Sequence, residues 1–251
     1  MSRKTNTKHA HFLSLIIPAY KKEKTIVENV LRIKRVLDNI RYDYEIIVVV
    51  DGEVDKTTEK VKTAKISKLK LISYKTNYGK SYAIRKGMEN ARGDYVMFMD
   101  SGMEIDPNGI SMLLEHMEWY NADIIVGSKR HPASQVSYSM MRKILSYGYY
   151  WLVKLLFSIK VTDTQAGIKI FRKRVLQRIL PRLVEKKFAG DLEILVVAKQ
   201  LGYIRIYEAP IKMDYHFAAI SDAATVQAII GIMKDTCAIF YRTYISNHYK
   251  N

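Results

Sequence analysis

Short apolar runs alternate with amphipathic segments along the first part of the chain. The run Leu13–Pro18 is apolar and ends at a proline, and Thr25–Ile40 carries apolar residues at the spacing of one helical face. The run Glu45–Val50 is β-branched almost throughout, which is typical of a strand with both faces covered by helices. The pattern therefore predicts a strand, a helix and a second strand inside a sheet.

The same alternation continues to about residue 130. It predicts strands at Lys68–Tyr74, Tyr95–Met99 and Ala122–Val126, with a helix at Ser81–Ala91. Repeated strand and helix units of this length require right-handed crossovers and a mostly parallel sheet. We therefore expect an α/β doubly wound arrangement, with helices flanking the sheet.

Polar residues follow three of these strands. Tyr20, Asp51 and Asp100 each come just after an apolar run, so a parallel sheet would place them at its carboxyl edge, where such sheets bind ligands. Asp51 can also cap a turn and Tyr20 can simply pack, but a carboxylate after a buried strand is costly without a partner. Asp106 precedes a proline and is better explained as a helix cap. The pattern favours a site for a charged small molecule.

Two apolar segments follow in the second half. Tyr138–Ile159 is dense in Tyr, Trp and Leu and is interrupted by basic residues, so it can form a membrane-interface segment or an ordinary buried helix pair. Beyond Tyr215 the spacing predicts a long amphipathic helix that packs on the domain or lies on anionic lipid. We divide the chain into a basic tail (1–12), a main domain (13–215) and a helical extension (216–251).

Composition supports a single core. The chain has 251 residues and is 48% hydrophobic, and it shows no linker-like stretch or repeat. A lone cysteine, Cys237, excludes an internal disulfide framework and a cysteine metal cluster, which fits a reducing compartment. No apolar signal core and no apolar run of ~20 residues is present, so we expect a cytoplasmic protein.

The chain is strongly basic. Its formal charge is +16 and its pI is about 9.7, so it attracts nucleic acid, anionic lipid and phosphorylated metabolites alike. The basic residues are spread along the chain, and we find no zinc-finger spacing, RNA-binding strand motif or basic heptad region. We therefore predict no specific nucleic-acid partner and interpret most lysines as a solvated surface.

Five blocks of the sequence resemble family 2 glycosyltransferases with the GT-A fold. In order they are LSLIIPAYKKEKTI, EIIVVVDGEVDKT, NYGKSYAIRKGMENARGDYVMFMDSGMEIDP, ADIIVGSKR and DTQAGIKIFRK, and the third is the most specific. The chain looks most like the dolichyl-phosphate and polyprenyl-phosphate mannose or glucose synthases. The resemblance implies a Rossmann-like nucleotide-sugar fold and an inverting hexosyltransferase that uses a nucleotide diphosphate sugar and a polyprenyl phosphate.

The resemblance also implies a donor site. It places Pro18 and Tyr20 beside the base of the nucleotide, with Asp51 accepting a hydrogen bond from it; an aromatic face and a carboxylate can hold a ring and read its N–H groups. Asn77 and Lys80, within the most specific block, complete the donor-binding residues that the resemblance implies.

A divalent cation is the cofactor that the resemblance implies. In the family the Asp100 block binds Mg²⁺ or Mn²⁺ at the donor diphosphate. The usual second aspartate is Gly102 here, but Glu104 stands where another oxygen ligand is common, and Mg²⁺ needs few protein ligands. The Asn and Glu that usually follow the first-strand tyrosine are Lys21 and Lys22. We hypothesise that one of these lysines supplies positive charge beside the donor; the alternative is that both face solvent.

The acceptor residues implied by the resemblance lie in the second half. Arg130 and Arg142 are the predicted ligands of the acceptor phosphate, because a guanidinium grips phosphate oxygens with a planar fork. Asp163 is expected near the reaction centre and Asp191 beneath the acceptor, and with Asp100 they form the predicted catalytic residues. A phosphate nucleophile is already charged, so these acids would orient it more than deprotonate it.

Two other functions stay open from the sequence. The same fold can use a saccharide or protein hydroxyl as acceptor, in which case a strong base is needed and Asp191→Asn should lose rate. The altered donor residues also allow a nucleotide-sugar-binding homologue without turnover. Glu193 follows Asp191 by two positions on a predicted helix, so it faces another direction and is expected to be structural. We expect a peripheral protein at the cytosolic face of an anionic membrane.

Overall fold

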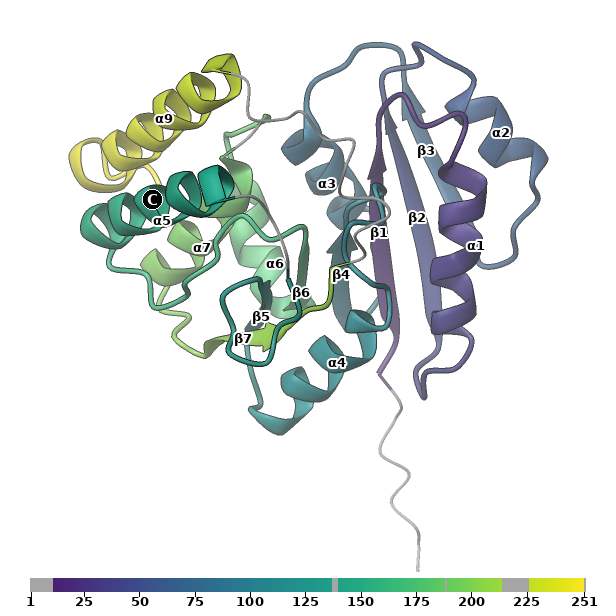
Figure 1. Ribbon diagram of the computed structural model, residues 1–251, viewed down its shortest axis with the longest axis horizontal. Helices are drawn as coiled ribbons and strands as arrows, with labels where there is room; N and C mark the ends of the chain where they lie inside the picture. Colours follow the sequence, from purple (N-terminus) through teal and green to yellow (C-terminus); the bar gives the residue numbers. More distant parts are fainter. Residues whose placement is uncertain (1–10, 137–139, 188, 214–225, 251) are drawn as a thin grey trace, which may run out of the picture.

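One mixed sheet organises the molecule (Figure 1). The computed structural model describes residues 11–136, 140–187, 189–213 and 226–250, with the backbone alone for 140–142 and 226–228. In these ranges seven strands have the order β3-β2-β1-β4-β6-β5-β7. Their bounds are β1 Leu13–Ala19, β2 Tyr44–Asp51, β3 Leu69–Tyr74, β4 Tyr95–Met99, β5 Ile124–Ser128, β6 Ile168–Arg172 and β7 Ile206–Pro210. The predicted mostly parallel α/β sheet is confirmed.

Strand β6 runs opposite to the others. It pairs antiparallel with both β4 and β5, whereas the remaining neighbours pair parallel. The start of β6 therefore lies at the edge where β1, β2, β4 and β5 end. The backbone N–H of Asp100, just after β4, donates to the carbonyl of Gly167, just before β6, at 2.9 Å. Segment 162–167 thus joins the edge that carries Tyr20, Asp51 and Asp100.

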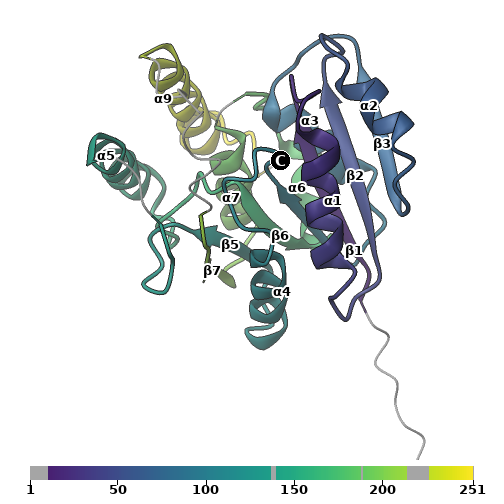
Figure 2. The same cartoon turned by 45° about the vertical axis from the view of Figure 1, so that its right-hand side comes forward.

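Helices cover both faces of the sheet, as Figures 1 and 2 show. Side chains of successive strand residues point to opposite faces, so Ile17 and Val48 enter one core while Ile16 and Ile47 enter the other. This explains why the strands are apolar without alternation. The first core is covered by α1 (Ile26–Leu37), α2 (Thr57–Thr63) and α4 (Gly109–Trp119), the second by α3 (Lys80–Glu89), α6 (Lys173–Ile179) and α7 (Gly190–Gln200), with the 3₁₀ turn η1 (Leu180–Arg182) following α6.

Two further helices lie side by side at the end of the molecule away from β3 (Figures 1 and 2). They are α5 (Met140–Phe157) and α9 (Val226–Phe240), the latter followed by a π-helical turn, η2 (Tyr241–Ile245). Tyr149 Oη on α5 lies 3.1 Å from Thr236 Oγ1 on α9. The C-terminal amphipathic helix that the sequence predicts is therefore present, and it contacts α5. Among the described helices, none has both the length and the apolar character needed to cross a bilayer.

The predicted element boundaries are close to the observed ones. Each predicted strand begins and ends within two residues of its observed counterpart, and the helix expected at Thr25–Ile40 is α1. The helix cap expected at Asp106 is wrong: α4 begins at Gly109 and its N-cap is Asn108, while the Asp106 carboxylate accepts the backbone N–H of Asn108 at 2.9 Å. An Asx turn therefore precedes the helix.

Candidate active site

A cavity of about 550 Å³ opens at the carboxyl edge of β1, β2 and β4. Its size is in the range of small-molecule sites in proteins. It contains every residue that the sequence analysis assigned to the donor or its cation, namely Pro18, Tyr20, Lys22, Asp51, Asn77, Lys80, Asp100 and Glu104. Residues from four separate stretches of chain thus meet in this donor cavity, while their roles toward a donor stay predictions.

Asp51 shapes the wall of the donor cavity. Its side chain is buried, and its two carboxylate oxygens accept the backbone N–H groups of Tyr78 and Gly79, both at 2.8 Å. The Asn77 amide donates to the Asp51 backbone carbonyl at 3.1 Å. Gly79 has φ +111°, and a Cβ there would lie 2.5 Å from the Lys186 carbonyl, so glycine is required. Both Asp51 oxygens are thus bonded within the protein, and the predicted hydrogen bond from the base to this carboxylate stays a prediction.

Four charged side chains of alternating sign extend inward from the donor cavity. Lys80 Nζ lies 2.7 Å from Oδ1 and 2.9 Å from Oδ2 of Asp100, and 3.7 Å from Oδ2 of Asp191. Asp191 Oδ1 lies in turn 2.5 Å from Nζ of Lys169, which is fully buried. We call these four residues the Lys80 cluster; its formal charges cancel.

Burial and ion pairing shift the pKa values of the residues in this cluster in opposite directions. Burial alone would lower the pKa of Lys80, but Asp100 and Asp191 raise it above its ordinary value. Burial likewise opposes ionisation of Asp191, and the two lysines outweigh it, so the pKa of Asp191 is lowered. For Lys169 burial prevails, and its pKa is lowered despite the contact with Asp191. Lys80 and Asp191 are therefore both charged at neutral pH.

Two carboxylates can hold a divalent cation in the donor cavity. Asp100 and Glu104 both line it, and in the described part of the chain no atom beyond the adjoining residues lies within 4 Å of an ideal Cβ on Gly102. The resemblance places the family's second aspartate at this position. Across the described ranges, no group of three or more His, Cys, Asp or Glu is placed to bind a metal. These residues fit a cation that takes its other ligands from water and a diphosphate, as Mg²⁺ commonly does.

The two lysines after Tyr20 occupy different environments. Lys22 lines the donor cavity, and its backbone N–H donates to Thr57 Oγ1 at 2.9 Å. Lys21 has a left-handed backbone, with φ +51°, and its Nζ lies 5.3 Å from the centre of the Tyr20 ring. Of the pair, Lys22 alone is among the residues that line this cavity, so the hypothesis of a positive charge beside the donor now concerns Lys22.

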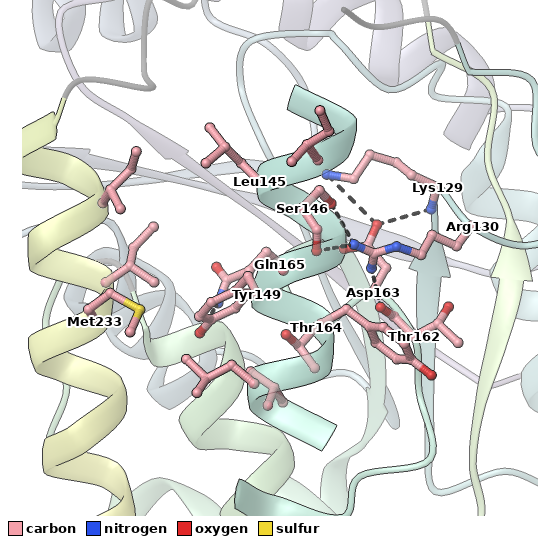
Figure 3. A pocket seen from close by; sticks show the side chains of 17 residues that line it. Lys129, Arg130, Leu145, Ser146, Tyr149, Thr162, Asp163, Thr164, Gln165 and Met233 are labelled. Atoms are coloured by element: carbon pink, nitrogen blue, oxygen red, sulfur yellow. Dashed lines mark hydrogen bonds and ion pairs between the residues drawn. The ribbon is translucent and has the colours of Figure 1, made fainter. Parts of the chain in front are cut away.

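A second cavity, of about 690 Å³, lies between α5 and α9 (Figure 3). Segment 162–165, which leads into β6, and the end of β5 form its polar wall. Lys129, Arg130 and Asp163 belong to this wall. The opposite walls are apolar and come from the two helices; they include Ile144, Leu145, Leu152, Val153, Ile229, Ile232 and Met233. We call it the α5–α9 cavity.

Arg130 is one of the two predicted ligands of an acceptor phosphate, but its guanidinium is already engaged by the protein. It donates to the backbone carbonyl of Thr162 and, at 2.5 Å, to Ser146 Oγ (Figure 3). Its Cζ lies 5.0 Å from the ring centre of Tyr147. Arg130 therefore ties α5 to the polar wall. Arg142, the other predicted phosphate ligand, lies in the first turn of α5, and its side chain falls outside the described residues.

Hydrogen bonds hold Asp163 in the polar wall of the α5–α9 cavity. Its buried carboxylate accepts the backbone N–H of Lys129 at 3.0 Å, and Lys129 Nζ lies 3.7 Å away. The backbone N–H groups of Thr162 and Asp163 both donate to Glu208 Oε1, at 2.8 and 3.0 Å. Lys129, with 29% of its side chain exposed, is thus a cation of this wall that solvent reaches.

Glu193 has the structural role that the sequence predicts. Its buried carboxylate accepts the backbone N–H groups of Val184 and Glu185 and, at 2.6 Å, the hydroxyl of Tyr249. Arg242 Nη1 lies 3.4 Å from the same carboxylate. This network anchors the segment after α9 to α7.

Sequence reasoning missed Lys169, Glu208 and the α9 side of the second cavity. Lys169 stands between two isoleucines in β6, where a period of two puts it on the face opposite to them. Because both faces of this sheet are covered, a lysine at this position needs a carboxylate partner. The lysine within an apolar strand was therefore a signal in the sequence for a buried ion pair. The α9 residues carry no polar signal, so only the packing of α9 against α5 reveals them.

The chain is similar to several known glucosyltransferases. It is 29% identical over 206 residues to a dolichyl-phosphate beta-glucosyltransferase of Dictyostelium discoideum, covering 76% of this chain and 63% of that protein. It is 28% identical over 252 residues to the Saccharomyces cerevisiae protein of the same name, covering 91% of this chain and 74% of the yeast protein. The chain thus spans less than two thirds of the Dictyostelium protein.

Solved structures share the fold. Mannosyl-3-phosphoglycerate synthase from Rubrobacter xylanophilus matches with a TM-score of 0.71 at 14% identity, covering 94% of this chain and 75% of that chain. Glucosyl-3-phosphoglycerate synthase from Mycobacterium tuberculosis, solved with Mn²⁺, UDP and phosphoglyceric acid, matches with a TM-score of 0.66 at 16% identity, covering 92% and 78%. Synthases of this fold have thus been crystallised with a divalent cation, in agreement with the GT-A architecture.

The family profile described as Glycosyl transferase family 2 matches residues 14–180, which is more than half of the chain. The matched range runs from β1 to the start of η1 and so contains the whole donor edge of the sheet. The chain therefore belongs to glycosyl transferase family 2.

Proposed function

We propose that the protein transfers a hexose, with glucose the first to test, from a nucleotide diphosphate sugar to a polyprenyl phosphate of the dolichyl type. The names of its relatives support this choice of substrates. The observation that carries it is the position of segment 162–167. Asp163 and Thr164 line the α5–α9 cavity, while Gly167 bonds to Asp100 in the donor cavity. An apolar acceptor site with a cationic wall thus adjoins a polar donor site.

The reaction would be a single displacement. A phosphate oxygen of the acceptor attacks the anomeric carbon, the bond from that carbon to the diphosphate oxygen breaks, and the nucleoside diphosphate leaves. An anionic phosphate needs no strong base, which agrees with Asp191 being committed to Lys169 and Lys80. Asp163 and Asp191 would position the groups around the reaction. A cation held by Asp100 and Glu104 would neutralise charge on the leaving diphosphate.

An anionic membrane surface is the partner we propose for the outer sides of α5 and α9. Large apolar side chains there face solvent, and Lys154 Nζ lies 4.9 Å from the Trp151 ring centre, combining cationic and aromatic character. The net charge of +16 would add long-range attraction to anionic lipid. A polyprenyl acceptor is embedded in the membrane. We propose that the protein acts at the cytosolic face of that membrane. The exposed residues include Tyr147, Trp151 and Leu155 on α5, Ile230 on α9, and Tyr244 and Ile245 on η2.

A transfer assay tests this function directly. Purified protein would be incubated with Mg²⁺ or Mn²⁺, a short-chain polyprenyl phosphate, and UDP-glucose or GDP-mannose in parallel. We expect glycolipid from one of the donors, no product with a free saccharide acceptor, and loss of product in Asp100→Asn. A thermal-shift panel of the same donors shows which of them binds, because a ligand of the folded state raises the melting temperature.

One alternative has a specific observation behind it. Gly102 leaves the cation site with fewer protein oxygens than the family pattern, which favours a nucleotide-sugar-binding homologue without turnover. Such a protein would show the thermal shift without product from any acceptor. Product from a hydroxyl acceptor alone would instead indicate a saccharide or protein substrate.

A further inference from the structure

The carboxylate expected to hold the cation is already paired. Both oxygens of Asp100 lie within 2.9 Å of Lys80 Nζ. The pair sits at the surface of the donor cavity, with 37% of the Lys80 side chain and 42% of the Asp100 side chain exposed. Both side chains line the donor cavity, so a diphosphate or a divalent cation that enters it can compete for either member of the pair.

The charge around Asp100 is balanced before any ligand arrives. The Lys80 cluster contains two lysines and two aspartates, and its formal charges cancel. A divalent cation entering alone would add two positive charges beside the ammonium group of Lys80, which repels it. A cation entering with a diphosphate brings compensating negative charge. The phosphate oxygens also offer Lys80 new hydrogen-bond acceptors.

Lys80 is free to change partners, whereas Lys169 is not. Lys169 is fully buried, donates to the Ala166 carbonyl at 2.8 Å and contacts Asp191 at 2.5 Å. Lys80 is the first residue of α3, lines the donor cavity and has Asp191 as a second carboxylate at 3.7 Å. Its ammonium can therefore move off Asp100 without losing every counter-charge.

We propose that Lys80 closes the cation site at Asp100 until the donor binds, so that a divalent cation and the nucleotide diphosphate enter together. This inference rests on the proposed function, since it takes the donor to be a nucleotide diphosphate sugar. It assigns Lys80 a positioning role in the free protein and a phosphate-binding role in the complex.

Binding of Mn²⁺ to the full chain tests the inference without a turnover assay. Electron paramagnetic resonance measures free Mn²⁺ with no nucleotide, with UDP and with GDP. For the wild type we expect at least tenfold tighter Mn²⁺ binding with one of the nucleotides than without. Lys80→Met and Lys80→Gln remove the ammonium and should raise nucleotide-free Mn²⁺ affinity at least tenfold. Lys80→Arg retains the charge and should leave the site closed.

Lys187→Met is the matched control. Lys187 is exposed and lines the same cavity, so its substitution removes the same charge at another position. Its nucleotide-free Mn²⁺ affinity should stay within about twofold of the wild type. An equal gain in Lys187→Met, no gain in either neutral Lys80 variant, or no nucleotide-dependent Mn²⁺ binding with UDP and GDP would each overturn the inference. Wild-type protein that shows the expected Mn²⁺ pattern but transfers no sugar would refute the proposed function alone.

Discussion

Gly167 lies directly against the carboxylate of Asp100: an ideal Cβ on Gly167 would be 2.2 Å from Oδ2 and 2.7 Å from Cγ. The backbone N–H of Asp100 also donates a hydrogen bond to the Gly167 carbonyl, with 2.9 Å between nitrogen and oxygen, and this bond holds the two residues together. A side chain on residue 167 is therefore incompatible with the present position of Asp100. The loop that leads into β6 sets the geometry of the donor cavity.

Gly167→Ala should lower nucleotide-sugar binding and transfer at least tenfold. The added methyl group displaces the Asp100 carboxylate, and an error of about 1 Å in a catalytic group can cost 10²-fold in rate. Thermal shift with the donor and the transfer assay measure the two effects. Gly102→Ala is the control, because among the residues that the structure describes none beyond its chain neighbours has an atom within 4 Å of its ideal Cβ. Equal losses in both variants would show that the contact with Asp100 is not the cause.

Gly102→Asp should strengthen cation binding in the donor cavity. The new carboxylate enters open space two residues after Asp100 and adds an oxygen ligand of the type that Mg²⁺ and Mn²⁺ prefer. We expect at least tenfold tighter Mn²⁺ binding in the presence of nucleotide. Gly102→Asn provides nearly the same shape without the charge. If Gly102→Asp binds Mn²⁺ no more tightly than the wild type and Gly102→Asn, a side chain at position 102 does not reach the cation.

Asp191→Asn should destabilise the fold by about 3–5 kcal/mol, because it leaves the buried ammonium of Lys169 without its counter-charge. Urea unfolding measures this loss. The double variant Lys169→Met, Asp191→Leu removes both charges and should recover most of the stability. A single variant as stable as the wild type would mean that Lys169 is not charged in the folded protein. The transfer rate of Asp191→Asn tests for a catalytic base only if it is measured on protein that is still folded.

The strands and the acidic residues at their ends could be predicted from the sequence. Continuous apolar runs such as Glu45–Val50 have one stable environment, a doubly covered strand, and Asp51 and Asp100 follow from parallel pairing. The reversal of β6 was not readable, because strand direction is set by pairing partners far along the chain. The engagement of Arg130 by Ser146 and Thr162 depends on how α5 packs, which periodicity does not encode.

The stability of the C-terminal anchor should depend on pH through Glu193. Burial raises the pKa of Glu193, more than the hydrogen bonds from Tyr249, Glu185 and Val184 lower it. The folded protein thus holds this proton more tightly than the unfolded chain. The resulting stability is complete below the ordinary pKa of 4.5 and is lost as pH rises through the raised folded-state value.

Urea unfolding at a series of pH values tests this sign. The wild type should lose stability relative to Glu193→Gln as the pH is raised from 4.5 toward neutrality, because glutamine has no proton to lose. A difference between the two proteins that does not vary with pH would contradict the assignment.

Replacing Trp151 and Leu155 by serine should weaken binding to anionic vesicles at least tenfold. These side chains are 61% and 81% exposed on α5, so the folded structure does not depend on them. Vesicle flotation measures binding, and Trp119→Ser is the control, since Trp119 is 85% exposed on α4 instead. Unchanged flotation of the double variant would rule out α5 as a membrane-binding surface.

The reversed direction of β6 has a consequence for how this chain tolerates changes in length. Segment 162–167 is stretched between Glu208, which fixes Thr162 and Asp163, and Asp100, which fixes Gly167. One inserted or deleted residue here would change the spacing between Asp163 and Gly167. The α5–α9 cavity and the donor cavity would then no longer be aligned for transfer. Residues 64–68 before β3 line neither the donor cavity nor the α5–α9 cavity, so the same insertion there should cost less transfer activity. An insertion and deletion scan would therefore show which loops set the spacing between the two cavities.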